Sequence, residues 1–369
     1  MILESLEITH LRNLQHLKLI PHPTTNFIIG QNGSGKTSIL EAIALLSNGR
    51  SFRAADPKKV ISNGASQLVV FANLVSTQDE GVTPVGISKS VDGSTHVRIN
   101  GITQKKISTL AAKLPVVVID TDSIEVVDGG PSVRRSLLDW GMFHVKHSYL
   151  HSWQRYRQIL KQKNALIKSG KSLGTKEIAY WNEQLAVEGT TIDEFRSTYV
   201  TQLNQIYQRT TQKYLKISQS TQLKYRHGWN REKYDSLKDC LNASTDQEIE
   251  RKSCLYGPHR GDLTIQWEDG LVKDICSRGQ KKLVLYGVKL AQVALMREMT
   301  DRSPLLLLDD LPAELDKNNI ENVTRFLMDF PCQTFITAIS EQSINETLLS
   351  QLTDHHMFHV KHGYLTDIE

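Results

Sequence analysis

Hydrophobic and polar residues alternate at the start of the chain in the manner of β-strands. The alternation predicts a strand pair at 2–8 and 14–20, joined by a turn at Arg12–Asn13. A third strand at 26–30 leads into a glycine-rich loop and then a helical segment, 37–49, that ends in glycine. This succession of strand, loop and helix indicates an α/β fold.

Shorter strands interrupted by Gly and Pro follow at 67–76, 85–91 and 95–100, and they predict an antiparallel lobe. The uniformly apolar run 114–120 predicts a buried strand. A helix is expected to begin at Pro131, because proline suits the first turn, and to continue through Trp140.

The segment 141–256 differs from the rest, since Gly is sparse and Gln, Lys, Arg and Tyr are abundant in a helical pattern. No heptad register persists, so the pattern favours a compact helical insertion over a long coiled coil. After residue 257 strands return at 262–267, 305–310 and 334–339, with a long helix at 277–299. We therefore expect an α/β head with an antiparallel β lobe, built from 1–140 and 257–369, and an all-helical arm, 141–256.

One hexapeptide, MFHVKH, occurs twice, at 142–147 and 357–362. Its two histidines, three apart, allow a metal site, but a strand with both histidines on one face is the better explanation. The distance between the two copies matches no known repeat period.

Composition narrows the class of protein. The 369 residues contain 44 Lys and Arg against 40 Asp and Glu, a net charge of +4 that alone does not indicate a nucleic-acid partner. No apolar stretch is long enough to span a membrane, and the first residues lack the features of a signal peptide. The four cysteines are far apart, which argues against a zinc site or disulfide framework. A cytoplasmic protein without membrane contact is expected.

The strongest chemical signal fits the phosphate-binding pattern G-x-x-x-x-G-K-S/T. Its glycines allow positive-φ turns that direct successive N–H groups at a phosphate, and the following helix adds partial positive charge. We expect Lys36 to reach the β- and γ-phosphates and the Thr37 hydroxyl to ligate Mg²⁺. The predicted nucleotide-binding residues of this loop are Gly30, Gln31, Asn32, Gly33, Ser34, Gly35, Lys36 and Thr37.

The apolar run 305–310 ends in two acids, Asp309 and Asp310. By itself it is equally a buried strand with a polar exit. Combined with the loop, it brings a carboxylate beside Mg²⁺ at the carboxyl edge of the same sheet. Asp309 is expected to hold the metal through water and Asp310 to orient or deprotonate the attacking water, so that Lys36, Asp309 and Asp310 form the catalytic set.

Three further segments resemble motifs of ABC-type ATPases. Ser277-Arg278-Gly279-Gln280 resembles the signature motif, Glu314-Leu315-Asp316 resembles the D-loop, and Thr337 falls at the position of the switch residue. Taken alone, the first segment is better explained as an ordinary helix N-cap, and only the series of motifs favours a signature. The resemblance implies that Ser277 and the adjacent amides bind the γ-phosphate held by a second subunit, and therefore an ATP-dependent homodimer.

Further motifs, which follow one another in order along nearly the whole chain, restrict the resemblance from ABC-type ATPases in general to one family. They are Arg12-Asn13, the loop and helix at 30–43, Gly49-Arg50-Ser51-Phe52-Arg53, Gly129-Gly130-Pro131, Arg134-Arg135, Leu138-Asp139, Gly257-Pro258-His259-Arg260 and the SRGQKKL segment from Ser277. Together they resemble the RecF family of bacterial recombination-repair proteins. The motifs do not assign roles to Arg50, Arg53, His259 or Arg260.

The resemblance implies an ABC-type ATPase head, ATP and Mg²⁺ as cofactors, and an ATP-induced dimer. It also implies binding to duplex and single-stranded DNA at gaps, help in recombinase loading, RecR- and RecO-type partners, and association with the nucleoid. Two departures bear on hydrolysis: Ala313 stands where Ser is usual, and Asp310 where most ABC ATPases use Glu. A shorter acid lies farther from the water, so weak, DNA-stimulated hydrolysis is expected.

Local charge supports a DNA surface. Residues 151–176 contain seven Lys and Arg and no acid, and 207–233 contain seven more against Glu232, with aromatic residues interleaved. The alternative for each stretch is a helical face that only contacts solvent. For the arginine pair at 134–135, the alternative is a surface salt bridge to Asp139. The predicted DNA contacts are Arg134, Arg135, Arg155, Arg157, Lys161 and Lys163.

Other classes of protein share some of these motifs. A transporter motor subunit predicts a shorter interval between Lys36 and Asp309 and no basic arm. A chromosome scaffold of the SMC type needs long heptad coiled coils. A nucleotide-binding scaffold that does not hydrolyse ATP is a further alternative, because Asp310 replaces the usual Glu.

Overall fold

The computed structural model describes residues 1–54, 56–76, 81–169, 175–217, 221–268, 270–344, 346–352 and 354–366. The chain forms two compact units. The first unit combines 1–124, 213–216 and 286–369, and the second combines 125–212 and 217–285.

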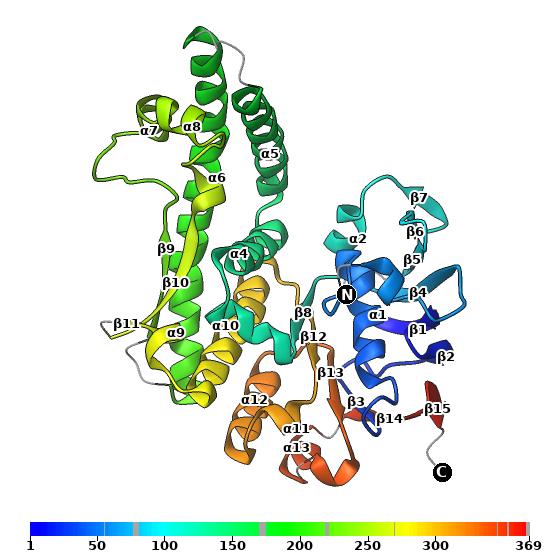
Figure 1. The fold of residues 1–369 in the computed structure, drawn as a ribbon. Coiled ribbons are helices and arrows are strands. Elements are labelled where there is room, and N and C mark those ends of the chain that lie inside the picture. Colours follow the sequence, from blue (N-terminus) through cyan, green and yellow to red (C-terminus); the bar gives the residue numbers. More distant parts are fainter. Residues whose placement is uncertain are drawn as a thin grey trace. The chain divides into compact units, whose positions relative to one another are not determined.

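The first unit contains an antiparallel sheet, visible in Figure 1, in the order β2-β1-β4-β5-β6-β7. Its strands are β1 (Ile2–Leu11), β2 (Leu14–Leu19), β4 (Gln67–Val75), β5 (Val82–Ser90), β6 (Thr95–Ile99) and β7 (Ile102–Gln104). The predicted turn at Arg12–Asn13 joins β1 to β2. The predicted antiparallel lobe is therefore confirmed.

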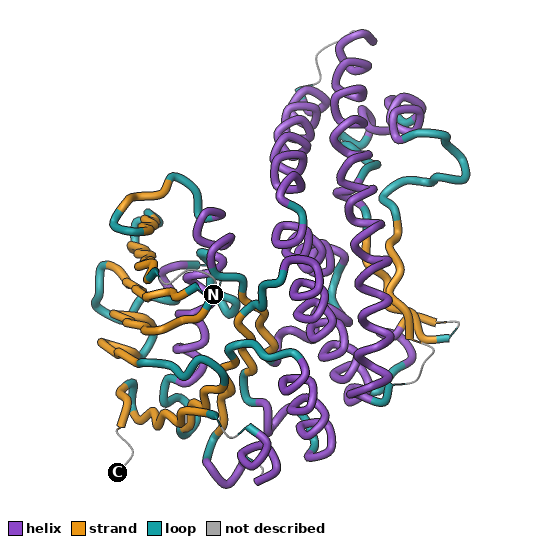
Figure 2. The backbone as a smooth tube through the Cα atoms, turned by 180° about the vertical axis from the view of Figure 1, so that it is seen from behind, coloured by secondary structure: helices purple, strands orange, loops and turns teal. Residues whose placement is uncertain are grey.

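The second sheet of this unit has the order β15-β14-β3-β13-β12-β8. Its strands, orange in Figure 2, are β3 (Thr25–Ile29), β8 (Val116–Ile119), β12 (Leu305–Leu308), β13 (Thr334–Ala338), β14 (His355–Lys361) and β15 (Tyr364–Thr366). All neighbouring pairs from β14 to β8 are parallel, whereas β15 is antiparallel to β14. The carboxyl ends of β3, β12 and β13 therefore meet at one edge.

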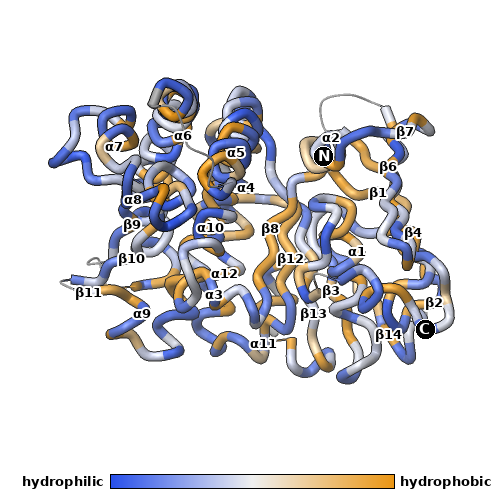
Figure 3. The backbone as a smooth tube through the Cα atoms, turned by 45° about the horizontal axis from the view of Figure 1, so that its top comes forward, coloured by the Kyte–Doolittle hydropathy of each residue, from blue (hydrophilic) through white to orange (hydrophobic). Residues whose placement is uncertain are grey.

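Helix α1 (Lys36–Asn48) packs against strands of both sheets and shares one hydrophobic core with them. It is buried on nearly all sides, which explains its apolar run 42–46, and the polar Ser38 and Glu41 are buried with it. The apolar character of the core strands is also plain in Figure 3 along β8 and β12. The helix ends at Gly49, whose φ of 63° is left-handed, as the sequence predicted.

Shorter helices complete the first unit. They are α2 (Ser108–Lys113), α11 (Leu311–Glu314), α12 (Lys317–Asp329), α13 (Glu346–Gln351) and the later part of α10 (Arg278–Thr300). No helix in the described part of the chain has the length and apolarity that a membrane crossing requires.

In the second unit the long helices α5 (His147–Lys168) and α6 (Thr175–Thr210) pack side by side (Figure 1). Smaller helices accompany them: α3 (Glu125–Asp128), α4 (Pro131–Val145), α7 (Leu237–Ala243), α8 (Thr245–Glu250), α9 (Val272–Ile275) and the start of α10. A small antiparallel sheet of β9 (Thr221–Arg226), β10 (Asp262–Trp267) and β11 (Gly270–Leu271) lies in the order β11-β10-β9.

The prediction of an all-helical arm over 141–256 was wrong in two respects. β9 lies inside that segment and pairs with β10, which the prediction assigned to the head. The compact unit is also longer, 125–212 and 217–285, because α4 packs on both α6 and β10. The helix predicted to end at Trp140 continues to Val145.

The two copies of MFHVKH adopt different structures. The first ends α4 and begins α5, so the strand prediction was wrong there. Five residues of the second copy lie in β14, where Met357 pairs in register with Phe27, so the strand is confirmed there. The expectation of both histidines on one face was wrong, because His362 follows the strand in a turn with a φ of 49°. Neighbouring segments decide the outcome: the first copy continues an amphipathic helix, whereas the second aligns with a buried strand.

Candidate nucleotide site

The glycine-rich loop connects β3 directly to α1 at the carboxyl edge of the parallel strands. Gly33 and Gly35 have φ values of 78° and 121°, which side-chain-bearing residues rarely adopt. A Cβ on Gly35 would also lie 2.8 Å from a Leu14 methyl carbon. The loop therefore takes the form that requires glycine at these positions, with the amino end of α1 facing it.

Lys36 lies inside the loop with only 6% of its surface exposed. Its Nζ donates hydrogen bonds to the carbonyl oxygens of Gly30 at 2.7 Å and Gln31 at 3.2 Å. Burial lowers the pKa of Lys36, and the nearby carboxylates of Asp310 and Asp309 oppose that effect. The ammonium group is therefore held at the loop, with the two acids that follow β12 nearby.

The side chain of Asp309, which follows β12, contacts two threonines. Thr37 Oγ1 lies 3.0 Å from both carboxylate oxygens, and Thr337 Oγ1 donates to Oδ1 at 2.7 Å. Burial raises the pKa of Asp309, and the two hydroxyl bonds partly offset this. Three predicted residues from three distant segments thus form one cluster.

Asp310 has a left-handed backbone, with a φ of 55°, and precedes α11. Its N–H donates to Thr337 Oγ1 at 2.7 Å, so Thr337 bonds to both acids. Asp310 lines the same cavity as Lys36 and Thr37. A left-handed conformation at a residue other than glycine is uncommon, though Asp tolerates it better than most, and such residues concentrate at functional sites.

The β1–β2 turn buttresses the loop, a role that the sequence did not reveal. Asn13 Nδ2 donates to the Gly33 carbonyl at 3.0 Å, and Ser38 Oγ donates to Asn13 Oδ1 at 3.2 Å. Arg12 makes two bonds to the buried carboxylate of Glu41 in α1, at 2.9 and 2.8 Å. Two ordinary features, a turn and a helix, are thereby fixed against the phosphate loop.

Two cavities adjoin the loop, and Asn32 and Gly33 line both. One, of about 510 Å³, contains Lys36 and Asp310 together with Arg53. The other, of about 450 Å³, is bounded by 339–342 and 359–362. Arg53, to which the sequence assigned no role, therefore lies at the candidate nucleotide site.

Another acid, which the sequence did not single out, follows the strand next to β12. Asp120 follows β8, the neighbour of β12, and burial raises its pKa while Lys289 opposes this. Thr121 donates from Oγ1 to Glu314 Oε1 at 3.1 Å. The signal was present, since 114–120 is an apolar run ending in an acid, as 305–310 is.

The predicted signature segment begins α10. Ser277 N–H donates to Gln280 Oε1 at 2.8 Å, and Gln280 N–H donates to Ser277 Oγ at 3.3 Å. This reciprocal pair is a helix N-cap, the alternative that the sequence left open. Arg278 and Gly279 form the first turn of the helix. A role for this segment toward a second subunit remains a prediction.

Asp316 of the predicted D-loop caps α12. Its carboxylate accepts bonds from Asn319 N–H at 2.9 Å and Asn319 Nδ2 at 2.7 Å. The side chain is exposed, so it does not contribute to the Asp309 cluster.

The DNA-contact prediction was wrong for Arg134 and Lys163, because both charges are buried in ion pairs. Arg134 makes two bonds to Asp262, at 2.9 and 3.0 Å, and so forms a salt bridge with a different acid from Asp139, the partner considered as the alternative. Lys163 Nζ lies 2.6 Å from Glu248, and both side chains are 1% exposed. Arg135 is half-buried and donates to the Gly261 carbonyl at 3.0 Å.

The other three predicted DNA contacts are exposed on α5. Arg155 is paired with Glu188 at 2.9 Å, whereas the Arg157 guanidinium lies over the Trp153 ring, 4.7 Å from its centre. Lys161 is one turn beyond Arg157 on the same face. Lys171, part of the same basic stretch, lies outside the described residues.

His259 anchors a loop. Its Nδ1 lies 2.6 Å from Tyr156 Oη, and its Nε2 lies 3.2 Å from the Cys254 carbonyl. Burial lowers the pKa of His259 to about 4, so the ring is neutral at physiological pH. It donates from Nε2 to Cys254 and accepts the Tyr156 hydroxyl at Nδ1.

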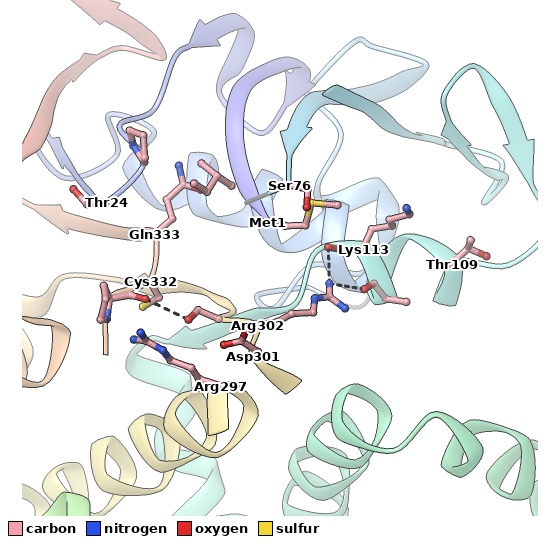
Figure 4. A pocket seen from close by; sticks show the side chains of 15 residues that line it. Met1, Thr24, Ser76, Thr109, Lys113, Arg297, Asp301, Arg302, Cys332 and Gln333 are labelled. Carbon is pink, nitrogen blue, oxygen red and sulfur yellow. Dashed lines mark hydrogen bonds between the residues drawn. The ribbon is translucent and has the colours of Figure 1, made fainter. Parts of the chain in front are cut away.

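Figure 4 shows a further cavity of the first unit, of about 660 Å³, lined by Arg297, Arg302 and Cys332 among others. It lies where β3, β8, β12 and β13 begin, since Thr24, Lys113, Ser303 and Gln333 line it. Ligands of parallel α/β sheets bind at the opposite, carboxyl edge. This cavity is therefore separate from the phosphate loop.

The fold and the phosphate-loop site define a P-loop head of the ABC and SMC class. A solved SMC head bound to the C-winged helix domain of ScpA has the same fold, with a TM-score of 0.60 and 15% identity over 100% of this chain and 97% of that one. The RecF/RecN/SMC N terminal domain family matches residues 2–362.

More specifically, the chain belongs to the RecF family. It is 36% identical over 365 residues to the DNA replication and repair protein RecF of Pseudoalteromonas translucida, covering 99% of both chains. The solved structure of the recombination mediator protein RecF-ATP in the RecFOR pathway matches with a TM-score of 0.87 and 25% identity, over 100% of this chain and 98% of that chain. The family assignment confirms the resemblance and removes the transporter alternative.

Proposed function

We propose that this chain is an ATP-dependent DNA-binding protein of recombinational repair and replication-fork maintenance, in which ATP brings two copies together on DNA. The observation that carries the proposal is the cluster of Thr37, Asp309 and Thr337 beside Lys36. The RecF-ATP structure and the repair proteins named RecF support it by similarity.

The donors of the cluster fit Mg²⁺, which prefers hard oxygen ligands. Thr37 Oγ1 and the carboxylate of Asp309 are such oxygens, and they lie together at the end of β12. Bound there, Mg²⁺ would neutralise charge on the β- and γ-phosphates. Lys36 exchanges its bonds to the Gly30 and Gln31 carbonyls for phosphate oxygens, and Asp310 orients the attacking water.

A second copy of the chain completes the nucleotide site in this proposal. The exposed N-terminus of α10, with Ser277 as its cap, presents N–H groups that suit a γ-phosphate held by the partner. Asp316 belongs to the same interface. A dimer that closes only with ATP follows, because one copy cannot supply both halves.

The DNA surface includes the exposed cations of α5, Arg157 and Lys161, which give sequence-independent affinity for phosphates. Gapped DNA, with duplex and single-stranded segments, is the proposed substrate, and RecR- and RecO-type proteins are the proposed partners in recombinase loading. Hydrolysis is slow because Asp310 is shorter than glutamate. A scaffold that binds ATP without hydrolysing it is the competing function.

Analytical sedimentation tests the proposal directly. The protein is run without nucleotide, with ADP and with ATP plus Mg²⁺, each with and without gapped DNA. A monomer that dimerises only with ATP and then sediments with DNA supports the proposal, whereas a monomer that binds no DNA under any condition overturns it.

Ser277→Arg provides the matched variant. It should leave ATP binding by the monomer intact and block ATP-dependent dimerisation, because the larger side chain obstructs the exposed helix end. A normal ATP-dependent dimer of this variant contradicts the trans role of Ser277. Phosphate release that stays at background with DNA present favours the scaffold over the slow ATPase.

A further inference from the structure

Two loops of the second unit, separated along the chain by α7 and α8, join to form a cavity of about 640 Å³. One segment runs from Arg226, the last residue of β9, to Asn230, and the other, 251–260, precedes β10. The Gly257 N–H donates to the Gly228 carbonyl at 3.1 Å. A Cβ on Gly228 would lie 1.9 Å from the Gly257 carbonyl oxygen, so only glycine permits this approach.

The cavity carries concentrated positive charge. Arg226, Arg251 and Arg260 line it together with His227, and no Asp or Glu is among the described residues that do so. All three arginines are exposed. Arg226 lies 4.0 Å from Asp262, which is already bonded to a buried arginine, and Arg260 donates one bond to the Cys254 carbonyl at 3.3 Å. The guanidinium groups thus keep most donors for an anionic ligand.

One buried carboxylate fixes the aromatic wall. Asp193, 4% exposed, accepts hydrogen bonds from Tyr225 Oη at 2.7 Å, His227 Nδ1 at 2.6 Å and Trp229 Nε1 at 3.3 Å. Trp229 also lies under the Arg231 guanidinium, 5.7 Å from its ring centre. The rings of His227 and Trp229, which line the cavity, are therefore held before any ligand arrives.

The cavity combines features that nucleotides require. Its arginines suit a phosphate, and the half-buried rings of Trp229 and Tyr256 offer flat apolar surface to a base. A base inside a duplex cannot reach such a surface, because it is stacked between its neighbours. An unpaired nucleotide can present its phosphate and its base together.

We propose that this cavity binds an unpaired nucleotide of single-stranded DNA, with the phosphate on Arg251 and Arg260 and the base against Trp229 or Tyr256. The inference rests on the proposed DNA binding and adds the site and the strand state that it recognises. It also gives Arg260 a role distinct from that of its neighbour His259, which holds the loop.

The test compares the full chain with the variant Arg251→Ala/Arg260→Ala in fluorescence anisotropy at fixed salt, using labelled oligo-dT and a labelled duplex. Affinity for oligo-dT should fall at least about tenfold, whereas duplex and ATP binding stay within about twofold. Arg325→Ala, which removes an exposed arginine from α12, is a control and should change neither affinity. Oligo-dT containing 5-iododeoxyuridine should crosslink to the peptide with Trp229 or Tyr256.

The possible failures are distinguishable. If the wild-type chain binds neither DNA, the proposed function itself fails. If it binds oligo-dT but the double variant binds equally well, or the crosslink maps elsewhere, only this inference is overturned. A competition experiment tests the base contact. dTMP should displace oligo-dT at a lower concentration than inorganic phosphate does, and equal displacement by both rules out a base contact.

Discussion

Thr37 and Asp309 are 272 positions apart, yet Thr37 Oγ1 lies 3.0 Å from both carboxylate oxygens of Asp309. Thr37 lies in the first turn of α1, the helix after β3, whereas Asp309 follows β12, and β13 lies between the two strands. Parallel strands end at the same edge of a sheet, so this proximity is a direct consequence of the topology. The pair therefore places a hydroxyl and a carboxylate, both possible Mg²⁺ ligands, at the same edge of the sheet.

Asp309→Asn should abolish most ATP hydrolysis. The amide keeps the size of the side chain and can still accept a bond from Thr37, but it has no charge to hold Mg²⁺. We expect phosphate release to fall at least about a hundredfold. Asp301→Asn, an exposed acid at the amino edge of the sheet, is the control and should behave as wild type. Equal loss in both variants would discount a specific role for Asp309.

The same substitution should stabilise the nucleotide-free protein. Burial raises the pKa of Asp309, so the folded chain binds this proton more tightly than the unfolded chain does. Ionisation of Asp309 therefore lowers the free energy of unfolding as the pH rises from the usual Asp pKa to the raised pKa of the folded chain. Above the raised pKa, the full destabilisation is present. The melting temperature of Asp309→Asn should exceed that of wild type by more at pH 8 than at pH 4.

Thermal melts at the two pH values, without nucleotide or Mg²⁺, measure this difference. A variant that is less stable than wild type at pH 8 would mean that the Thr37 and Thr337 bonds outweigh the cost of the buried charge. Saturating ATP and Mg²⁺ should reverse the order, because only wild type gains from binding the metal.

Lys36 provides a graded test of the phosphate loop. Lys36→Ala removes the ammonium that bonds to the Gly30 and Gln31 carbonyls, and ATP binding should be lost to the detection limit. Lys36→Arg keeps the charge but replaces a compact ammonium with a planar fork, so ATP should bind while hydrolysis fails. Equilibrium binding of a labelled ATP analogue and phosphate release separate the two effects. Wild-type turnover by Lys36→Arg contradicts the argument.

The phosphate loop and the acids at 309–310 were predictable because each depends on a short local pattern. The topology then needed only parallel strands to bring them together. Asp120 has the same strand-then-acid pattern but no accompanying motif, so nothing in the sequence separated it from an ordinary strand end. The two copies of MFHVKH show the limit of prediction from a short segment, because identical residues form a helix end or a strand according to their neighbours.

Charge was the least predictable feature. A run of Lys and Arg does not reveal which members have partners far along the chain. Arg134 meets Asp262 and Lys163 meets Glu248, and neither partner is close in sequence. The six predicted DNA contacts thus include both buried structural charges and exposed ones, and these two classes should respond differently to mutation.

Arg134→Ala tests the buried class. Removing the guanidinium leaves Asp262 buried without its principal partner, which should cost about 3–5 kcal/mol of stability. Urea unfolding measures the loss. DNA affinity per folded molecule should not change. If the variant is as stable as wild type but binds DNA more weakly, Arg134 contacts DNA and its role is not structural.

Arg157→Gln/Lys161→Gln tests the exposed class on α5. Neither residue is buried, so the unfolding midpoint should remain that of wild type. Duplex affinity should weaken to a similar degree for unrelated sequences. The slope of log affinity against log salt should decrease by about two, one for each lost phosphate contact.

Salt titrations of the α5 double variant require a control that removes the same charge elsewhere. Lys317→Gln/Arg325→Gln on α12 removes two exposed cations from the head. An equal change of slope in both variants would mean that net charge, and not a DNA-contacting face, determines the affinity. A change confined to the α5 variant identifies this face of α5 as the surface that contacts phosphates, because the charge difference is the same in both and only its position differs.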